Sequence, residues 1–503
     1  MFSSAVGYIV PMLVNLITTP FLLHGLGESA YGLQSLVSVL VGYLTFMDMG
    51  LDLPITKLLA EDRAQQDTEA ENNLLSTTIQ LYGIIGLVGM TVIMLLADVF
   101  ALHVFKVSEE LIPSALLVFR LAGIGFLGSI SVSWGRAVAM GLQRFDLSYS
   151  VSVIVSTAGT LIGLGMVYAG YGVVGYVLVR VVFSLMAGPA YWFLARQLLP
   201  EFRFRLGLHR ATLRRVRSYV GYGMLNRVIS SLVSRLDQTL IGVWLGIAMA
   251  GVYAVPFMIV NSLGYMIAYM LGFIFPMASE LHGLGQMDHL RNIFTRATRF
   301  TVALASLVFF PLLAFGDLFL VLWVPSIAEQ ASGVLHLLLL AAYVSTLMAA
   351  LTNSIVVGLG LISQFTIYAT VRGLVLGVSC VLLIPLLGLE GAGWALLVTS
   401  GVDVVYMIIV LRNYLQISPA TLFIEAYLKP MALGVVLLIL AFLARPLVVS
   451  WIGLGMVMVG LGLFYFVTGY RFGVFGETEK RALVGFYRMA IQRTGRRGED
   501  VRD

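Results

Sequence analysis

The sequence is poor in charge and has almost no cysteine. Only 11% of its 503 residues are charged, whereas 59% are hydrophobic. A typical soluble domain has about 25% charged residues, so this composition excludes a soluble globular protein and predicts a polytopic membrane protein. The one cysteine, Cys380, lies in the apolar run GVSCVLLIPLL, so no intramolecular disulfide can form and the chain needs no oxidising compartment.

Several motifs that would indicate catalysis or a cofactor are also missing. No Walker A lysine motif occurs, and the six histidines have no metal-ligand spacing. We therefore expect no metal, no cofactor and no catalytic residue, and we do not interpret the chain as an enzyme. The net charge of +5 comes from residues in short connections between apolar runs, which excludes nucleic acid as a partner.

Long apolar runs are abundant. A transmembrane helix needs about 20 mostly apolar residues, and the alternating ten-residue segments of membrane strands are absent. By this measure we predict an all-α protein with about fourteen spans, at 2–23, 31–52, 74–97, 111–133, 147–169, 172–195, 218–244, 250–277, 294–316, 333–357, 363–386, 390–412, 427–445 and 449–470.

The basic residues predict the orientation of these spans. Of the 31 lysines and arginines, 24 fall in the even-numbered connections and the C-terminal tail, two fall on the opposite side, and five lie inside spans. Cytoplasmic loops of membrane proteins carry an excess of Lys and Arg. We therefore expect both termini to be cytoplasmic. The N-terminus has no basic leader region, so its first apolar run is predicted to be a span rather than a cleaved signal.

The chain repeats itself at an offset near 218 residues. FLLHGLGESAYG (21–32) resembles IGVWLGIAMAGVYA (241–254), and GYGVVGYVLV (170–179) resembles GLEGAGWALL (388–397). In these pairs Gly27 matches Gly246 and Tyr31 matches Tyr253. Each copy contains six spans, which predicts two parallel, pseudo-symmetric lobes with a substrate path between them. The expected division is an N-lobe 1–205, a C-lobe 206–415, two further helices in 416–470 and a basic tail 471–503.

Between the predicted lobes the sequence reads EFRFRLGLHRATLRRVRSY (201–219). Its arginines and interspersed apolar residues are typical of a helix that lies in the membrane interface. We therefore expect an interfacial amphipathic helix to connect the two lobes.

The seventh predicted span, NRVISSLVSRLDQTLI (226–241), carries charge inside an apolar chain. At 100° per residue, one face of a continuous helix holds Arg227, Ser231, Ser234 and Gln238, with Arg235 and Asp237 on its two flanks. A polar face at membrane depth lines water or protein rather than lipid. We therefore expect these side chains to line a cavity, together with Asn15 of the first span, the repeat partner of the seventh.

Three more arginines, Arg120, Arg180 and Arg372, lie inside spans, but the only deep acids are Asp237 and Asp403. This surplus of positive charge predicts an anionic ligand, and the planar guanidinium group suits phosphate. The alternative is that an arginine is a structural pin bonded to backbone carbonyls, which for Arg120 and Arg180 is equally compatible with the sequence. Asp237 and Asp403 fit either ion coupling or, more readily, pairing with an arginine.

Several short patterns resemble those of the polysaccharide-export flippases of the multidrug/oligosaccharidyl-lipid/polysaccharide superfamily, the Wzx-like proteins. LGESAYG (26–32) and FMDMGLDLPITKLLAE (46–61) are similar to the family's "LG…YG" and "DLGL…LAE" runs. GLQRFDLS (141–148) and RLDQTLIGVWLG (235–246) fit the family's connection after the fourth helix and its seventh helix. The chain begins almost inside its first span, unlike many relatives, so its start codon is expected to lie upstream.

The resemblance implies a MATE/MurJ-like fold and a flippase in the bacterial inner membrane. Its implied substrate is a polyprenyl-pyrophosphate-linked oligosaccharide, moved from the inner to the outer leaflet by alternating access for surface polysaccharide export. Other polysaccharide-assembly proteins are candidate partners. The alternatives left open are a flippase for lipid II, the peptidoglycan precursor, and a cation-coupled small-molecule exporter of the MATE type.

Overall fold

A computed structural model describes residues 2–48, 50–272 and 274–474. Within these residues the chain forms helices and no strands. This follows from the apolar sequence, because a helix satisfies its backbone N–H and C=O groups internally where no water is available. Eleven helical segments in the described residues are long and apolar enough to cross a membrane. The protein is therefore a multi-pass membrane protein with an all-α fold.

The predicted number of fourteen spans is approximate. Two of the eleven segments, Ile9–Leu44 and Tyr149–Leu198, each correspond to two predicted spans. The backbone breaks inside them at glycines with positive φ, at Gly27 (φ 76°) in the first and at Gly170 (φ 89°) in the second. Only glycine reaches these angles without a steric penalty from its side chain. The predicted span 218–244 is divided between two helices, as described below.

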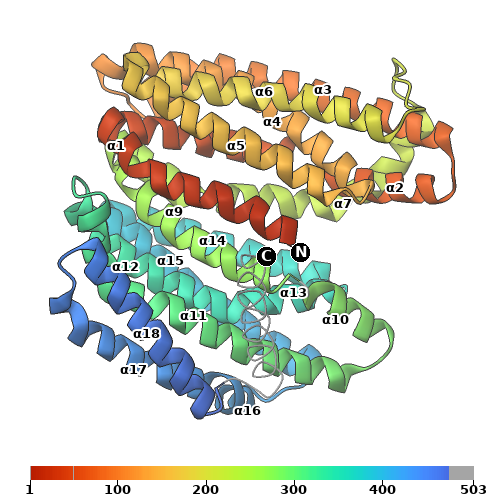
Figure 1. The fold of residues 1–503 in the computed structure, drawn as a ribbon. Helices are drawn as coiled ribbons and strands as arrows, with labels where there is room; N and C mark the ends of the chain where they lie inside the picture. The colour runs from red at the N-terminus through yellow and green to blue at the C-terminus, as the bar shows by residue number, and fades with distance from the viewer. Residues whose placement is uncertain (1, 49, 273, 475–503) are drawn as a thin grey trace, which may run out of the picture. The chain divides into compact units, whose positions relative to one another are not determined.

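The chain forms two compact units. Unit 1 comprises residues 1–262 and 366–399, and the helices within it run alongside one another (Figure 1). It holds α1 (Phe2–Leu44), α2 (Asp52–Ala64), α3 (Thr68–Asp98), α4 (Ile112–Gly141), α5 (Phe145–Met166), α6 (Gly172–Leu198), α7 (Arg210–Val233), α8 (Leu236–Trp244), most of α9 (Ile247–Met270), most of α14 (Ile362–Leu387) and the start of α15 (Leu389–Val410).

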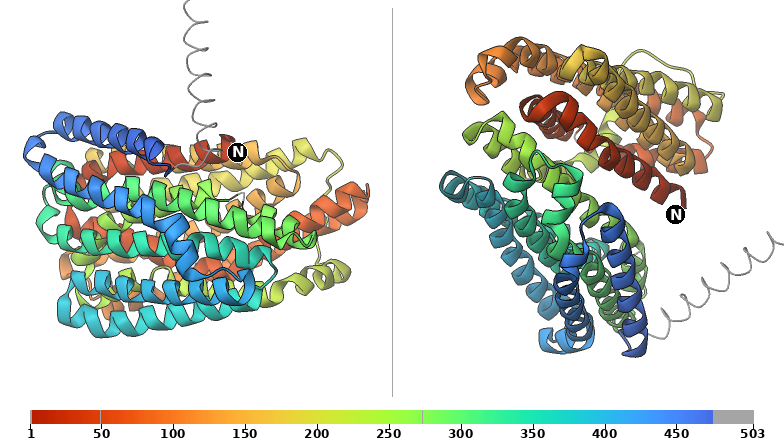
Figure 2. Two further views of the ribbon diagram at one scale, coloured as in Figure 1. Left: turned by 90° about the horizontal axis from the view of Figure 1, so that it is seen from below. Right: turned by 60° about the vertical axis from the view of Figure 1, so that its left-hand side comes forward.

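Unit 2 comprises residues 263–365 and 400–503, of which 475–503 lie outside the described residues. Its core lies where α11, α17 and α18 pack together around Phe315, Leu437 and Tyr465 (Figure 2). Arg445 pairs with Asp317 at one end of this core. The unit holds the end of α9, α10 (Ile274–Gly283), α11 (Met287–Trp323), α12 (Ala328–Ser345), α13 (Leu351–Gly358), the rest of α15, α16 (Pro419–Leu422), α17 (Leu428–Ala444) and α18 (Trp451–Arg471).

These units and the predicted lobes divide the chain at different residues. The units describe which helices pack together, whereas the lobes were inferred from a sequence repeat, so the lobe boundaries stay a prediction. The expected interfacial helix over 201–219 is wrong in its first half, because residues 201–209 are not helical and α7 begins only at Arg210. The side chains of α3 hold this connecting segment by its backbone instead.

Candidate functional site

The predicted seventh span is interrupted near its middle. α7 ends at Val233, α8 begins at Leu236, and the backbone of Arg235 (φ −138°, ψ 13°) lies outside the helical region. Ser234 also lies in this break, where its hydroxyl donates to the carbonyl oxygen of Ser231 at 3.0 Å. The 100° spacing does not hold across the break. The prediction of one continuous polar stripe is therefore wrong.

Asp237 and Gln238, in the first turn of α8, are buried inside unit 1. The Tyr253 hydroxyl donates to Asp237 Oδ2, and the backbone N–H of Gln238 donates to Asp237 Oδ1 at 2.8 Å. Gln238 Nε2 donates to the Ser35 hydroxyl. Negative charge is favourable in the first turn of a helix, which helps to keep an acid here. Among the described side chains, Asp237 therefore accepts hydrogen bonds from the Tyr253 hydroxyl and the Gln238 backbone N–H. We had expected an arginine as its partner.

The second deep acid, Asp403, lies on the part of α15 that belongs to unit 2 and is fully buried. The Ser345 hydroxyl at the end of α12 donates to Asp403 Oδ2 at 2.5 Å. Both buried acids thus accept a hydrogen bond from a side-chain hydroxyl. A role in ion coupling stays a prediction for both.

A cleft of about 310 Å³ lies within unit 1, between the second half of α1, α4 and α6. Its polar lining consists of Gln34, Ser38, Ser129, Arg180 and Ser184. The remaining lining residues are small or aliphatic: Val37, Val41, Gly42, Ala122, Gly125, Val177 and Val181. The cleft therefore combines an apolar wall with hydroxyl, amide and guanidinium groups, and among the described residues no carboxylate lines it.

Arg180 supplies the charge of this cleft. It lies on α6, one turn after Tyr176, whose hydroxyl is 3.5 Å from Arg180 Nη1. The guanidinium carbon also lies 5.8 Å from the centre of the Tyr176 ring. The Arg180 side chain nevertheless remains exposed. An exposed arginine within a membrane helix is expensive unless it faces water or a ligand, so the cleft is the part of unit 1 best suited to an anion.

Arg235 borders the same cleft from the helix break. A Cβ atom added to Gly42, a cleft residue, would lie 2.8 Å from Arg235 Nε and 3.5 Å from its Cζ. The guanidinium group therefore packs directly on the bare backbone of α1 at Gly42. Thr239 and Tyr43 hold the neighbouring turn, because the Thr239 hydroxyl donates to the Arg235 carbonyl at 3.0 Å and contacts the Tyr43 hydroxyl. Of the five predicted arginines, Arg180 thus lines the cleft, and Arg235 contacts its wall at Gly42 without lining it.

The other predicted site residues lie elsewhere. Arg120 forms an ion pair with Asp98 of α3 at 3.6 Å and does not line the cleft. Arg372 is half-buried on α14, next to Gly373, which packs against Val233 at the end of α7.

Two further predicted residues belong to the first and seventh predicted spans. Asn15 is half-buried on α1, and its carbonyl accepts from the Thr19 hydroxyl at 2.7 Å. The backbone of Arg227 belongs to α7, but its side chain lies outside the described part of the structure. Ligand contact by Arg120, Arg372, Asn15 and Arg227 stays a prediction.

The cleft residues of α1, α4 and α6 other than Arg180 are not among the residues predicted from the sequence. A signal was available, since Gln34, Ser38 and Gly42 are four residues apart and therefore share one face of α1. Ala122, Gly125 and Ser129 of α4 follow the same helical spacing. Small and weakly polar residues are also usual where membrane helices pack, so spacing alone does not distinguish a cleft from a helix contact.

Residues 1–282 match the family described as "Polysaccharide biosynthesis protein". This match covers more than half of the 503 residues. The chain belongs to this family. The family prediction made from LGESAYG and the other short patterns is confirmed.

Among curated proteins, this polysaccharide biosynthesis protein is similar to the "Putative O-antigen transporter" of Shigella flexneri. The two are 22% identical over 284 residues. The similarity covers 55% of this chain and 65% of the relative, so it spans less than two thirds of the relative's length.

Two solved structures have the same fold as this polysaccharide biosynthesis protein. One is the lipid II flippase MurJ in an inward closed conformation, with a TM-score of 0.73, 11% identity, and coverage of 94% of this chain and 99% of that one. The other is an inward-facing MATE family multidrug transporter of the MOP superfamily, with a TM-score of 0.66, 14% identity, and coverage of 85% and 98%. At these identities the likeness establishes the fold and confirms the predicted MATE/MurJ-like architecture.

Proposed function

We propose that this protein is a flippase that moves a polyprenyl-pyrophosphate-linked oligosaccharide from the inner to the outer leaflet of the bacterial cytoplasmic membrane. Membership of the polysaccharide biosynthesis family and the similarity to an O-antigen transporter support this substrate class. Transport proceeds by alternating access between two repeats, with both termini in the cytoplasm. The protein acts as a transporter without a catalytic step, and its glycan comes from other proteins of polysaccharide assembly.

The cleft of unit 1 is the observation that carries this proposal. Arg180 lines it and Arg235 contacts its wall at Gly42, while no carboxylate of the described part of the chain lines it. Guanidinium groups form strong paired hydrogen bonds with phosphate oxygens, and the hydroxyls of Ser38, Ser129 and Ser184 suit the hydroxyl groups of a sugar. A cationic drug, the cargo of the exporter alternative, would be repelled by the same arginines.

The test is transport of a fluorescent polyprenyl-pyrophosphate oligosaccharide in liposomes that contain the purified protein. We expect Arg180→Gln and Arg235→Gln to lower the rate by about ten- to a hundredfold, because a hydrogen bond to a charged group contributes about 1.5–3 kcal/mol. Arg180→Lys tests whether the planar fork is needed in addition to the charge.

The matched control is Arg196→Gln, on the same helix as Arg180 but outside the cleft, where the guanidinium lies over the Trp192 ring. It should transport at the rate of the unmodified protein. A parallel assay with lipid II tests the peptidoglycan alternative. Equal rates for the Arg180, Arg235 and Arg196 variants at equal amounts of protein would contradict the proposed site, and faster transport of lipid II would contradict the proposed substrate.

A further inference from the structure

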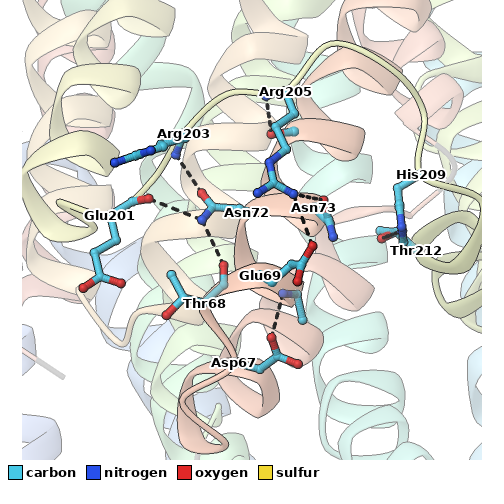
Figure 3. Close-up of polar contacts among 12 residues, drawn as sticks. Asp67, Thr68, Glu69, Asn72, Asn73, Glu201, Arg203, Arg205, His209 and Thr212 are labelled. Carbon is cyan, nitrogen blue, oxygen red and sulfur yellow. Dashed lines mark hydrogen bonds and ion pairs between the residues drawn. The ribbon is translucent and has the colours of Figure 1, made fainter.

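The segment between α6 and α7 is fastened to α3 at every second residue. Asn72 Oδ1 accepts from the backbone N–H of Arg203 at 2.7 Å, and the Ser76 hydroxyl accepts from that of Arg205 at 3.0 Å (Figure 3). Gln80 Oε1 accepts from the backbone N–H of Gly207 at 2.9 Å. Asn72, Ser76 and Gln80 are four residues apart, so one face of α3 holds the backbone of this segment.

Because the backbone groups of residues 203, 205 and 207 face α3, the residues between them form a second row. This row is apolar and consists of Phe202, Phe204, Leu206 and Leu208. Phe202 is buried, and both phenylalanines meet the Trp192 ring edge-on. Leu206 is 90% exposed, and Phe204 and Leu208 are also exposed. The row therefore begins in the protein core and ends with bare apolar side chains at the surface.

Exposed basic side chains follow these apolar residues along the chain. Arg210, Arg214 and Arg217 recur at helical spacing in the first two turns of α7, and all three are exposed. Within the described residues none of them forms an ion pair. Arg215, on the other side of the helix, instead pairs with buried Asp62 of α2 at 2.6 Å, and this bond raises the pKa of Arg215. Asp62 thereby fixes the rotation of α7 that turns the other three arginines outward.

We infer that residues 202–217 form a surface that binds anionic phospholipid. The segment follows directly from α6, a membrane-spanning helix, so it lies at the membrane boundary. Exposed leucines enter the boundary between headgroups and acyl chains, and the three arginines contact lipid phosphates. A basic side chain near an anionic membrane surface contributes about fivefold in affinity, or about 1 kcal/mol. This binding is independent of the transported substrate.

A fluorescent label at position 206 can report whether this residue lies in the lipid. Labelling can be confined to that site, because the single native cysteine, Cys380, is buried and can be replaced. In a Cys380→Ala background, Leu206→Cys is labelled with an environment-sensitive fluorophore and the full-length protein is placed in nanodiscs that contain doxyl-labelled lipid. The matched control is Gln65→Cys, an exposed position in the connection between α2 and α3 of the same unit. We expect quenching at 206 and none at 65.

The lipid class is tested by varying the phosphatidylglycerol content of phosphatidylcholine nanodiscs. We expect Arg210→Gln/Arg214→Gln/Arg217→Gln to raise the phosphatidylglycerol fraction at half-maximal quenching by at least about tenfold. The control removes three exposed basic charges of unit 2, Arg296→Gln/Arg412→Gln/Lys429→Gln, and should leave that fraction unchanged. Quenching at 206 no stronger than at 65, or an equal response of the two triple variants to phosphatidylglycerol, would overturn the inference.

Discussion

Two equivalent helix junctions in unit 1 have the same backbone but different chemistry. In the first repeat the chain turns at Gly27 (φ 76°), and in the second it turns at Gly246 (φ 91°), 219 residues later. A buried tyrosine follows each turn, Tyr31 four residues after Gly27 and Tyr253 seven residues after Gly246. The second repeated pair behaves in the same way, since Gly170 (φ 89°) and Gly388 (φ 60°) both have positive φ.

The polar partners of the two tyrosines differ. Tyr253 bonds the buried acid Asp237, whereas Tyr31 lies beside the hydroxyl of Thr19, which donates to a backbone carbonyl of its own helix. The first junction therefore needs no charge, and the second contains one. The two copies thus share their glycine turns and buried tyrosines, whereas the polar partners of the tyrosines differ.

A glycine of α1 and a glycine of α9 also bring the two repeats into close contact. A Cβ atom on Gly32 would lie 2.0 Å from the Ile247 carbonyl oxygen, and one on Gly251 would lie 2.9 Å from the Cα of Gly32 (Figure 1, α1 beside α9). Gly32 and Gly251 are 219 residues apart, the same offset as Gly27 and Gly246. The backbones of α1 and α9 therefore approach each other closely here, because neither glycine carries a side chain.

The largest effect is expected from Gly251→Val, which places a branched side chain at this contact between α1 and α9. The neighbouring atoms are backbone and cannot turn away, so we expect a loss of about 3 kcal/mol or more and little folded protein. Gly32→Val should behave alike. The measurement is the yield and thermal unfolding of purified protein, with Gly264→Ala, a site on α9 with open space, as the control. A stable Gly251→Val protein would contradict the close contact between α1 and α9.

An intermediate effect is expected from Tyr253→Phe, which removes the phenol that donates to buried Asp237. Leaving a buried acceptor unsatisfied costs about 1–3 kcal/mol. Tyr31→Phe removes the matching hydroxyl from a neutral partner and should cost about 1 kcal/mol or less. The free energies of unfolding of the two variants are compared by denaturation under identical conditions. Equal losses of stability would mean that the charge of Asp237 does not distinguish the junctions.

The smallest and most symmetric effect is expected from Gly27→Ala and Gly246→Ala. No atom lies within 4 Å of an added Cβ at either position, so only the backbone penalty remains. That penalty is about 1–2 kcal/mol for a non-glycine residue with positive φ. Thermal unfolding should show similar losses at the two sites. A large loss at one site alone would break the equivalence of the junctions.

The sequence was sufficient for the membrane class, the all-α fold and the family, because apolar run length and short residue patterns are local signals. It was not sufficient for the site. Arg235 and Gln238 were placed on one face by the 100° spacing of an unbroken helix. The helix in fact breaks at Ser234, and no proline or glycine in the sequence marks this break. The cleft was missed because its walls come from three helices that are distant in sequence, and only packing brings Ser38, Ser129 and Ser184 together.

The fastening of residues 203–207 to α3 has a mechanical consequence. A segment that connects two repeats would ordinarily be free to move. Here hydrogen bonds hold residues 203–207 to α3 of the first repeat, and the ion pair between Arg215 and Asp62 also holds the start of α7. The connection between the two repeats is therefore rigid as far as the start of α7. A rocking motion of the repeats would have to change the backbone after this point, and the non-helical residues Ser234 and Arg235 are the nearest such place.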